Sequence, residues 1–257
     1  MRIISVGHAS FAAAMIALGI LGLVYGDFAL VWQPVPKELP LRQIFAYACA
    51  VVALAGGLGL LWTRTAALAS QVLLVYLLLW LILLRLPALL TAPGVEISWL
   101  GCGETAVMVA GGWALFAYFA GQSPRFGFAA GKSGVRIARI LFGLAVIPCG
   151  LAHLVYAAET AALVPAWLPW PLGWAYLTGI AYIAAGIAVL VNAYARLAAI
   201  LTAAMMALIT LLVWIPAVAA APGSRFQLTA LVTSSALAAA ACAVAASYRG
   251  TPWRAFR

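Results

Sequence analysis

The stretch Leu83–Gly94 reads LLRLPALLTAPG and recurs in altered form at Leu212–Gly223 as LVWIPAVAAAPG. Six of the twelve positions are identical, at an offset of 129 residues. The same offset aligns Ala46-Tyr47 with Ala175-Tyr176, and an offset of 131 aligns Leu23-Val24-Tyr25 with Leu154-Val155-Tyr156. Because self-similarity at a fixed period sets the architecture of a chain, the sequence predicts a duplicated unit of about 125 residues.

Both copies of this unit are predicted to span a membrane. The chain is 67% hydrophobic and 7% charged, whereas about a quarter of the residues of a soluble domain are charged. A helix needs about 20 apolar residues to cross a bilayer, and long continuous runs favour helices over barrel strands. The eight predicted spans are Ile4–Tyr25, Gln43–Trp62, Ala66–Leu90, Trp99–Ala120, Ile137–Ala158, Trp174–Asn192, Leu197–Ala220 and Gln227–Ser247. We therefore predict an all-α integral membrane protein, and we expect the first span to be retained as a helix.

The domain organisation follows from four spans in each copy. An even number of spans gives the second unit the same orientation as the first, so the repeats are parallel. We predict a first four-helix repeat over residues 1–120, a basic cytoplasmic linker over residues 121–136, and a second repeat over residues 137–257 with a basic C-terminal tail.

The distribution of positive charge predicts the orientation. With both termini in the cytoplasm, ten basic residues lie inside and four lie outside, as the positive-inside rule requires. The predicted inner residues are Arg2, Arg64, Arg125, Lys132, Arg136, Arg139, Arg196, Arg249, Arg254 and Arg257, and the outer ones are Lys37, Arg42, Arg85 and Arg225. The net charge of +9 is thus explained by topology and by anionic lipid headgroups. It does not indicate nucleic-acid binding.

The start of the second copy resembles a known family. Gly150–Tyr156 reads GLAHLVY, Ala162–Pro169 reads ALVPAWLP, and Trp174–Gly179 reads WAYLTG. These segments are similar to the DoxX family of four-helix bacterial membrane proteins. The resemblance implies a four-helix bundle in each unit, a location in the bacterial cytoplasmic (inner) membrane, and an association with membrane redox complexes. It supplies no set of catalytic residues.

Arg85 and Glu104 are the most unusual residues within the predicted spans. Ionisable side chains inside a membrane are costly and mark functional sites. Both lie roughly 8 Å below the outer boundary, given a rise of about 1.5 Å per residue, on consecutive antiparallel spans. We predict that they form an ion pair. Two interpretations stay open, a pair that only locks two helices together and a Glu104 that accepts protons in an outward-facing pocket. The second copy has Trp214 and Thr233 at these positions.

His153 heads a second candidate group. Tyr156 and Glu159 follow it at spacings of three and six residues, which places all three near one face of a helix. His153 is either a satisfied core histidine or a hydrogen-bond donor and proton relay for a bound lipophile. Asp27 and Glu159 are expected at the mouth of a pocket whose walls carry tryptophan from the two long outer loops, over Phe28–Pro40 and Glu159–Gly173.

The sequence lacks the motifs of several classes of enzyme. No HExxH, CxxC, CxxCH, phosphate-loop or dinucleotide pattern is present, and no metal site is predicted. His8 is expected at the inner interface, at the opposite depth from His153, which argues against a shared haem. The leading hypothesis is a component of a membrane redox complex that binds a quinone-like lipophile near the outer leaflet, with membrane lipids and other membrane subunits as partners. The alternatives are a non-catalytic structural subunit and a transporter or lipophile-modifying enzyme.

Overall fold

The structure is a computed structural model that describes residues 4–121 and 124–253. Every regular element in these two ranges is a helix, and eight of the helices are long and apolar enough to cross a membrane. The spanning segments are Val6–Tyr25, Arg42–Leu60, Ala66–Thr91, Glu96–Ala120, Arg125–Val155, Pro171–Leu190, Ala195–Ala220 and Arg225–Ser247. The chain is therefore a multi-pass membrane protein. Arg2, Arg254 and Arg257 lie outside the described residues.

Some spans comprise more than one element. The elements in chain order are α1 (Val6–Tyr25), α2 (Arg42–Leu60), α3 (Ala66–Trp80), η1 (Leu81–Arg85), α4 (Leu86–Thr91), α5 (Glu96–Ala120), η2 (Pro124–Ala129), α6 (Gly131–Val155), α7 (Ala157–Ala162), α8 (Pro171–Leu190), α9 (Ala195–Ile209), η3 (Thr210–Trp214), α10 (Ile215–Ala220) and α11 (Arg225–Ser247). Helix α6 thus begins six residues before the span predicted from the sequence.

The third and seventh spans contain the same irregularity at the same place. The segments η1 and η3 are single π-helical turns, and the bounds of α3, η1 and α4 recur in α9, η3 and α10 at an offset of 129 residues. Pro87 and Pro216 follow within two residues. Proline has no N–H and cannot donate the helical hydrogen bond at its position. The π-turn shifts the hydrogen-bond pattern before each proline, so the helix continues past it.

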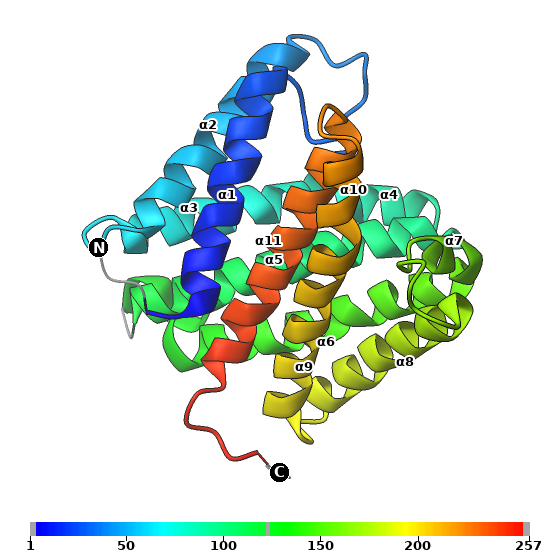
Figure 1. Cartoon of the computed structure of the whole chain (residues 1–257). Coiled ribbons are helices and arrows are strands. Elements are labelled where there is room, and N and C mark those ends of the chain that lie inside the picture. Colours follow the sequence, from blue (N-terminus) through cyan, green and yellow to red (C-terminus); the bar gives the residue numbers. More distant parts are fainter. Residues whose placement is uncertain (1–3, 122–123, 254–257) are drawn as a thin grey trace.

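The two ends of the described chain lie on one face of the molecule. Arg249 Nη1 donates a hydrogen bond of 3.1 Å to the carbonyl oxygen of Ile4. In Figure 1 both termini lie towards the lower left, with the connections α2–α3 and α8–α9, whereas α10, α4 and α7 lie towards the top and right. We call the first side the terminal face and the second the opposite face.

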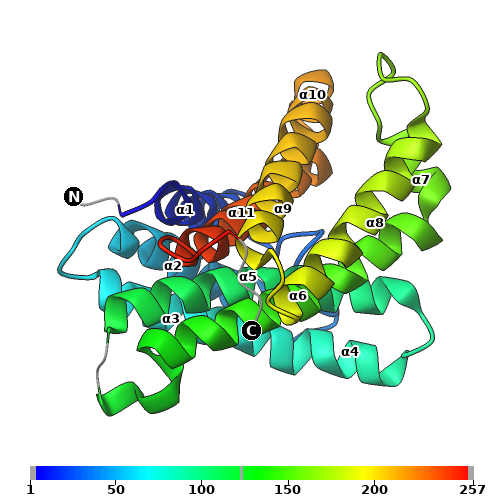
Figure 2. The ribbon, with the colours of Figure 1, turned by 90° about the horizontal axis from the view of Figure 1, so that it is seen from below.

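The helices of the two halves of the chain pack against each other. Helix α1 contacts α2 and α11, helix α6 contacts α8 and α5, and α5 contacts α11. In Figures 1 and 2, α1, α11 and α9 cover one side of a layer formed by α3, α5 and α6. The first helix of each half of the chain therefore packs against the last helix of the other half.

Small residues let α5 and α11 cross closely at the centre of this body. A Cβ atom at Gly111 would lie 2.5 Å from both Cα and Cβ of Ala240, and Ala240 is fully buried. Because van der Waals packing is the main force between helices in a lipid environment, such contacts set which helices meet.

His8 lies near the ends of three helices and is enclosed by the protein. Its side chain is fully buried, its Nε2 donates a 2.8 Å hydrogen bond to the carbonyl oxygen of Leu60, and its ring packs edge-on against Phe119. The bond uses one of the carbonyls that the end of α2 leaves unsatisfied. His8 therefore joins the ends of α1, α2 and α5 at the terminal face.

Candidate functional site

Arg85 binds the backbone of the loop between α1 and α2. Its guanidinium Nη2 donates hydrogen bonds to the carbonyl oxygens of Trp32, at 2.7 Å, and Val31, at 3.4 Å. The Trp32 ring is 1% exposed and packs against Tyr76 and Trp80, with ring centroids 6.0 and 5.7 Å away. The loop between α1 and α2 is thus folded against α3, and the hydrogen bonds from Arg85 hold its backbone there.

The predicted ion pair between Arg85 and Glu104 is not formed. The ion pairs among residues 4–121 and 124–253 both belong to Asp27. Arg85 lies directly against Gly101 of α5, and its Nη2 is taken by the loop carbonyls. It interacts with Glu104 only through longer-range electrostatics. The π-turn that ends at Arg85 explains the difference, because its wider turn moves the side chain around the helix axis from the position that an α-helix predicts.

Two buried donors in this cluster have no acceptor. Trp32 Nε1 and Arg85 Nε are inaccessible to solvent and make no hydrogen bond with any described residue. An unpaired buried donor costs about 1–3 kcal/mol, so each one in a native structure needs an explanation. A ligand that carries a carbonyl or carboxylate oxygen is one such explanation.

Glu104 lies on α5 between two groups of polar side chains. Helix α5 contacts α3 on one side and α6 on another. Glu104 is half-buried and lies within electrostatic range of Arg85 on the first side and of Cys149 and Tyr182 on the second. Its carboxylate makes no hydrogen bond within the described part of the chain, which leaves it available to a ligand or a proton.

His153 is held by α8. Its Nδ1 lies 2.7 Å from the Thr178 hydroxyl, and its ring packs edge-on against Tyr182, with centroids 5.4 Å apart. The Thr178 hydroxyl also donates to the carbonyl oxygen of Trp174 at 2.8 Å. A hydroxyl has one hydrogen, so this network assigns the imidazole proton to Nδ1 and leaves Nε2 as an acceptor.

The helix that was predicted to carry His153, Tyr156 and Glu159 on one face ends before Tyr156. Helix α6 ends at Val155, and Tyr156 has φ −104° and ψ 45°, outside the helical range. Glu159 is exposed on the short helix α7. Helical spacing therefore does not extend beyond Tyr156. Of this group, His153 packs against Tyr182, which lies within electrostatic range of Glu104.

Asp27 holds two segments of the chain together. Its Oδ1 accepts from Arg42 Nε at 2.9 Å, and its Oδ2 accepts from Arg225 Nη2 at 3.0 Å. Arg225 also donates to the carbonyl oxygen of Phe28 at 2.8 Å. Burial raises the pKa of Asp27, but the N–H of Phe28 and the two arginines lower it by more, so the pKa lies below its ordinary value of 3.8. We call Asp27, Arg42 and Arg225 the clasp.

The loop between α7 and α8 differs from the loop between α1 and α2. In the former, Trp167 is 70% exposed and Trp170 is 83% exposed, whereas Trp32 of the latter is buried. A tryptophan-lined pocket built from both loops is thus not present in this arrangement. Exposed tryptophans at the end of a spanning helix are typical of a membrane interface.

Tyr182 and Thr178 were not anticipated from the sequence. They lie four residues apart on α8 and so share one helix face. The sequence feature that could have indicated them is the pair Gly150 and Gly179, because glycines allow two helices to approach closely. A Cβ at Gly150 would lie 2.5 Å from the carbonyl oxygen of Gly179, and this close approach brings His153 against the residues beside Gly179.

No group of three His, Cys, Asp or Glu side chains suited to a metal ion occurs among the described residues.

Part of the chain is similar to a known protein family. Residues 134–214 match the model of the DoxX family. The match runs from the start of α6 to the end of η3 and includes His153, Thr178 and Tyr182. No curated protein and no solved structure shows significant similarity to the chain.

Proposed function

We propose that this chain, in which residues 134–214 form a DoxX-family domain, is a component of a membrane redox complex that binds a quinone-like lipophile near the outer leaflet. The observation that carries the proposal is the set of polar groups without partners around α5. Trp32 Nε1 and Arg85 Nε are donors without an acceptor, and Glu104 and His153 Nε2 lack a hydrogen-bond partner within the described residues.

A quinone suits these groups chemically. Its carbonyl oxygens accept hydrogen bonds and carry no charge, and its ring and tail are apolar. Trp32 Nε1 or Arg85 Nε would donate to one carbonyl oxygen. Reduction of a quinone to a quinol takes up two protons and two electrons. Glu104 and His153 would carry protons to the site, since carboxylates and imidazoles are the usual carriers in membranes, and a partner subunit would supply the electrons.

The membrane topology belongs to the same proposal. We place the opposite face outside and both termini in the cytoplasm of the bacterial inner membrane, with two parallel four-helix repeats joined by the basic linker. The hydrogen bond between Arg249 and Ile4 and the excess of basic residues on the terminal face support this orientation. The recurrence of π-turns at a fixed offset supports the duplication.

Quinone reduction should depend strongly on Glu104. Glutamine cannot take up and release a proton, so we expect Glu104→Gln to slow quinone reduction by about a hundredfold or more. His153→Ala should slow it by a similar or smaller factor. The rate is measured as the reduction of a water-soluble ubiquinone analogue by membranes that carry the protein. Glu159→Gln, which removes an exposed carboxylate, is the matched control and should react as the wild type does.

Replacing Trp32 distinguishes a ligand site from a purely structural cluster. Trp32→Phe keeps a buried aromatic ring but removes the Nε1 donor and leaves a cavity where the second ring lay, so the melting temperature should fall whether or not a ligand binds. If Nε1 donates to the ligand, the affinity for the ubiquinone analogue, measured by quenching of tryptophan fluorescence in detergent solution, also falls by about tenfold. Unchanged quinone affinity in Trp32→Phe and an unchanged rate of quinone reduction in Glu104→Gln, with stoichiometric co-purification of another membrane protein, would instead identify a structural subunit.

A further inference from the structure

The terminal face carries positive charge that no acidic side chain of the chain balances. Its described basic residues are Arg64, Arg125, Lys132, Arg136, Arg139, Arg196 and Arg249. The five acidic residues of the sequence are Asp27, Glu38, Glu96, Glu104 and Glu159, and all of them lie in the opposite half of the helices or in the loops beyond. None of the acidic side chains of the sequence therefore lies at the terminal face.

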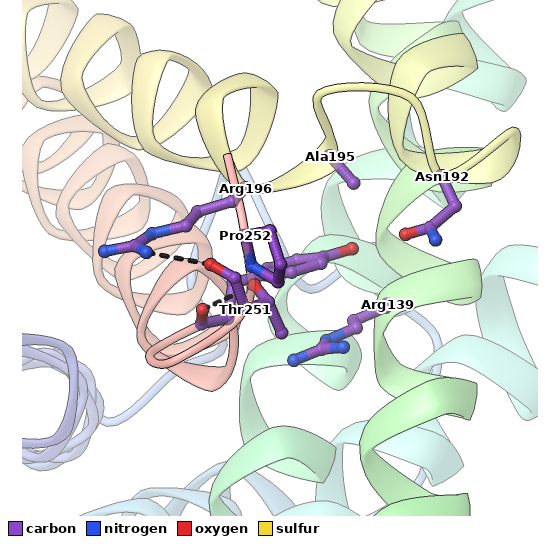
Figure 3. A pocket seen from close by; sticks show the side chains of 7 residues that line it. Arg139, Asn192, Ala195, Arg196, Thr251 and Pro252 are labelled. Atoms are coloured by element: carbon purple, nitrogen blue, oxygen red, sulfur yellow. Dashed lines mark hydrogen bonds between the residues drawn. The ribbon is translucent and has the colours of Figure 1, made fainter. Parts of the chain in front are cut away.

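Two of these arginines flank a hollow of about 280 Å³ between α6, the turn before α9, and the segment after α11 (Figure 3). Arg139 stacks on Tyr248, with its Cζ 3.7 Å from the ring centroid, and its Nε donates to the Ser247 hydroxyl at 3.0 Å. Arg196 Nη1 donates to the carbonyl oxygen of Thr251 at 2.9 Å. Both guanidinium groups are thus fixed by the C-terminal segment.

Each of these guanidinium groups keeps free donors. Arg139 Nη1 and Arg196 Nη2 make no hydrogen bond with residues 4–121 or 124–253, and the amide of Asn192 lies at the same hollow (Figure 3). Planar guanidinium donors held in fixed positions suit the oxygens of a phosphate group.

Arg196 also lines a second hollow, of about 410 Å³. Arg196, Arg249 and Ser5 form its polar end. Its remaining walls are apolar and come mainly from α9 and α11: Ile200, Ala203, Ala204, Ala207, Cys242, Ala245 and Ala246. From Ile200 to Ala207 it follows α9 for about 10 Å. The second hollow thus has cationic groups at one end and an apolar groove at the other.

In Figure 3 the Arg196 guanidinium points away from Arg139, with Thr251 and Pro252 between them. We propose that an anionic phospholipid occupies the second hollow, with its phosphate at Arg196 and Arg249 and an acyl chain along the groove between α9 and α11. Charge complementarity favours an anionic headgroup, because the lining of this hollow includes two arginines and no acid. The apolar groove favours a lipid over a free phosphate ion, which would fill only the polar end.

Thermal unfolding of the full chain in neutral detergent tests this proposal. We expect phosphatidylglycerol to raise the melting temperature, with phosphatidylcholine and inorganic phosphate having little effect. Arg196→Gln should raise the phosphatidylglycerol concentration for half-maximal stabilisation at least tenfold. Arg64→Gln, which removes an exposed arginine of the same face, should leave it unchanged.

Ala204→Phe supplies a variant that does not depend on the arginines. Its larger side chain would block the groove while leaving the phosphate end intact, so it should weaken the effect of phosphatidylglycerol severalfold. Equal stabilisation by inorganic phosphate would reassign the site to a free anion and overturn the lipid proposal. Equal stabilisation by phosphatidylcholine, or an unchanged response in both Arg196→Gln and Ala204→Phe, would also overturn it.

Discussion

Replacing Gly111 by leucine is expected to prevent the chain from reaching its folded state. Helices α5 and α11 cross at this residue, and even a Cβ atom would lie 2.5 Å from Ala240 Cα and 2.9 Å from its carbonyl oxygen. Backbone atoms cannot move aside alone, so the two helices would have to separate. Gly111→Ala should therefore lower the free energy of unfolding by about 1–3 kcal/mol, the usual range for overpacking, and Gly111→Leu by more.

The neighbouring glycine provides the control. A Cβ at Gly112 would meet Leu77 Cδ1 at 3.2 Å, the end of a flexible side chain. Alanine is also favoured over glycine inside a helix by about 1 kcal/mol. We expect Gly112→Ala to be neutral or stabilising in thermal unfolding and size-exclusion measurements in detergent. Equal stability of Gly111→Ala and Gly112→Ala would show that α5 and α11 do not cross at Gly111.

Loss of the Asp27 carboxylate is expected to open the clasp. Asp27→Asn keeps the shape of the side chain but leaves Arg42 and Arg225 without their anionic partner. Hydrogen bonds to charged groups contribute about 1.5–3 kcal/mol. Because the three side chains are about a quarter exposed, solvent screens part of this value, and we expect a loss of about 1–2 kcal/mol. Glu38→Gln, which alters an exposed carboxylate in the same loop, should change nothing measurable.

We expect the Asp27 carboxylate to make part of the free energy of unfolding sensitive to acid. The pKa of Asp27 is lower in the folded protein than its ordinary value of 3.8, so the unfolded chain binds the proton more tightly. The stabilisation is then fully present well above pH 3.8 and is lost as the pH falls through the lower, folded pKa. Comparing the melting temperatures of wild type and Asp27→Asn over this range isolates the effect. A constant difference between them down to pH 2 would contradict it.

The sequence by itself determined the elements that depend on local composition. Eight apolar runs of sufficient length predict eight spans, and the structure has them. The recurrence of Pro-Ala and Ala-Pro-Gly at a fixed offset marked two equivalent segments, and the structure has a π-turn just before the proline in both. Proline acts on the backbone immediately around it. The similarity to DoxX proteins was likewise readable from contiguous residues of the second copy, and the family match over residues 134–214 confirms it.

Only the tertiary structure decided which side chains meet. Matched depth suggested that Arg85 pairs with Glu104, but depth does not fix rotation about the helix axis, and a π-turn changes that rotation. Arg85 instead binds the loop that buries Trp32, and His153 meets Thr178 because Gly150 and Gly179 bring α6 and α8 together. The clasp and the arginine-lined hollows join residues more than 50 positions apart, as in Arg196 with Thr251. Such contacts depend on how the helices cross, which hydropathy and local spacing do not encode.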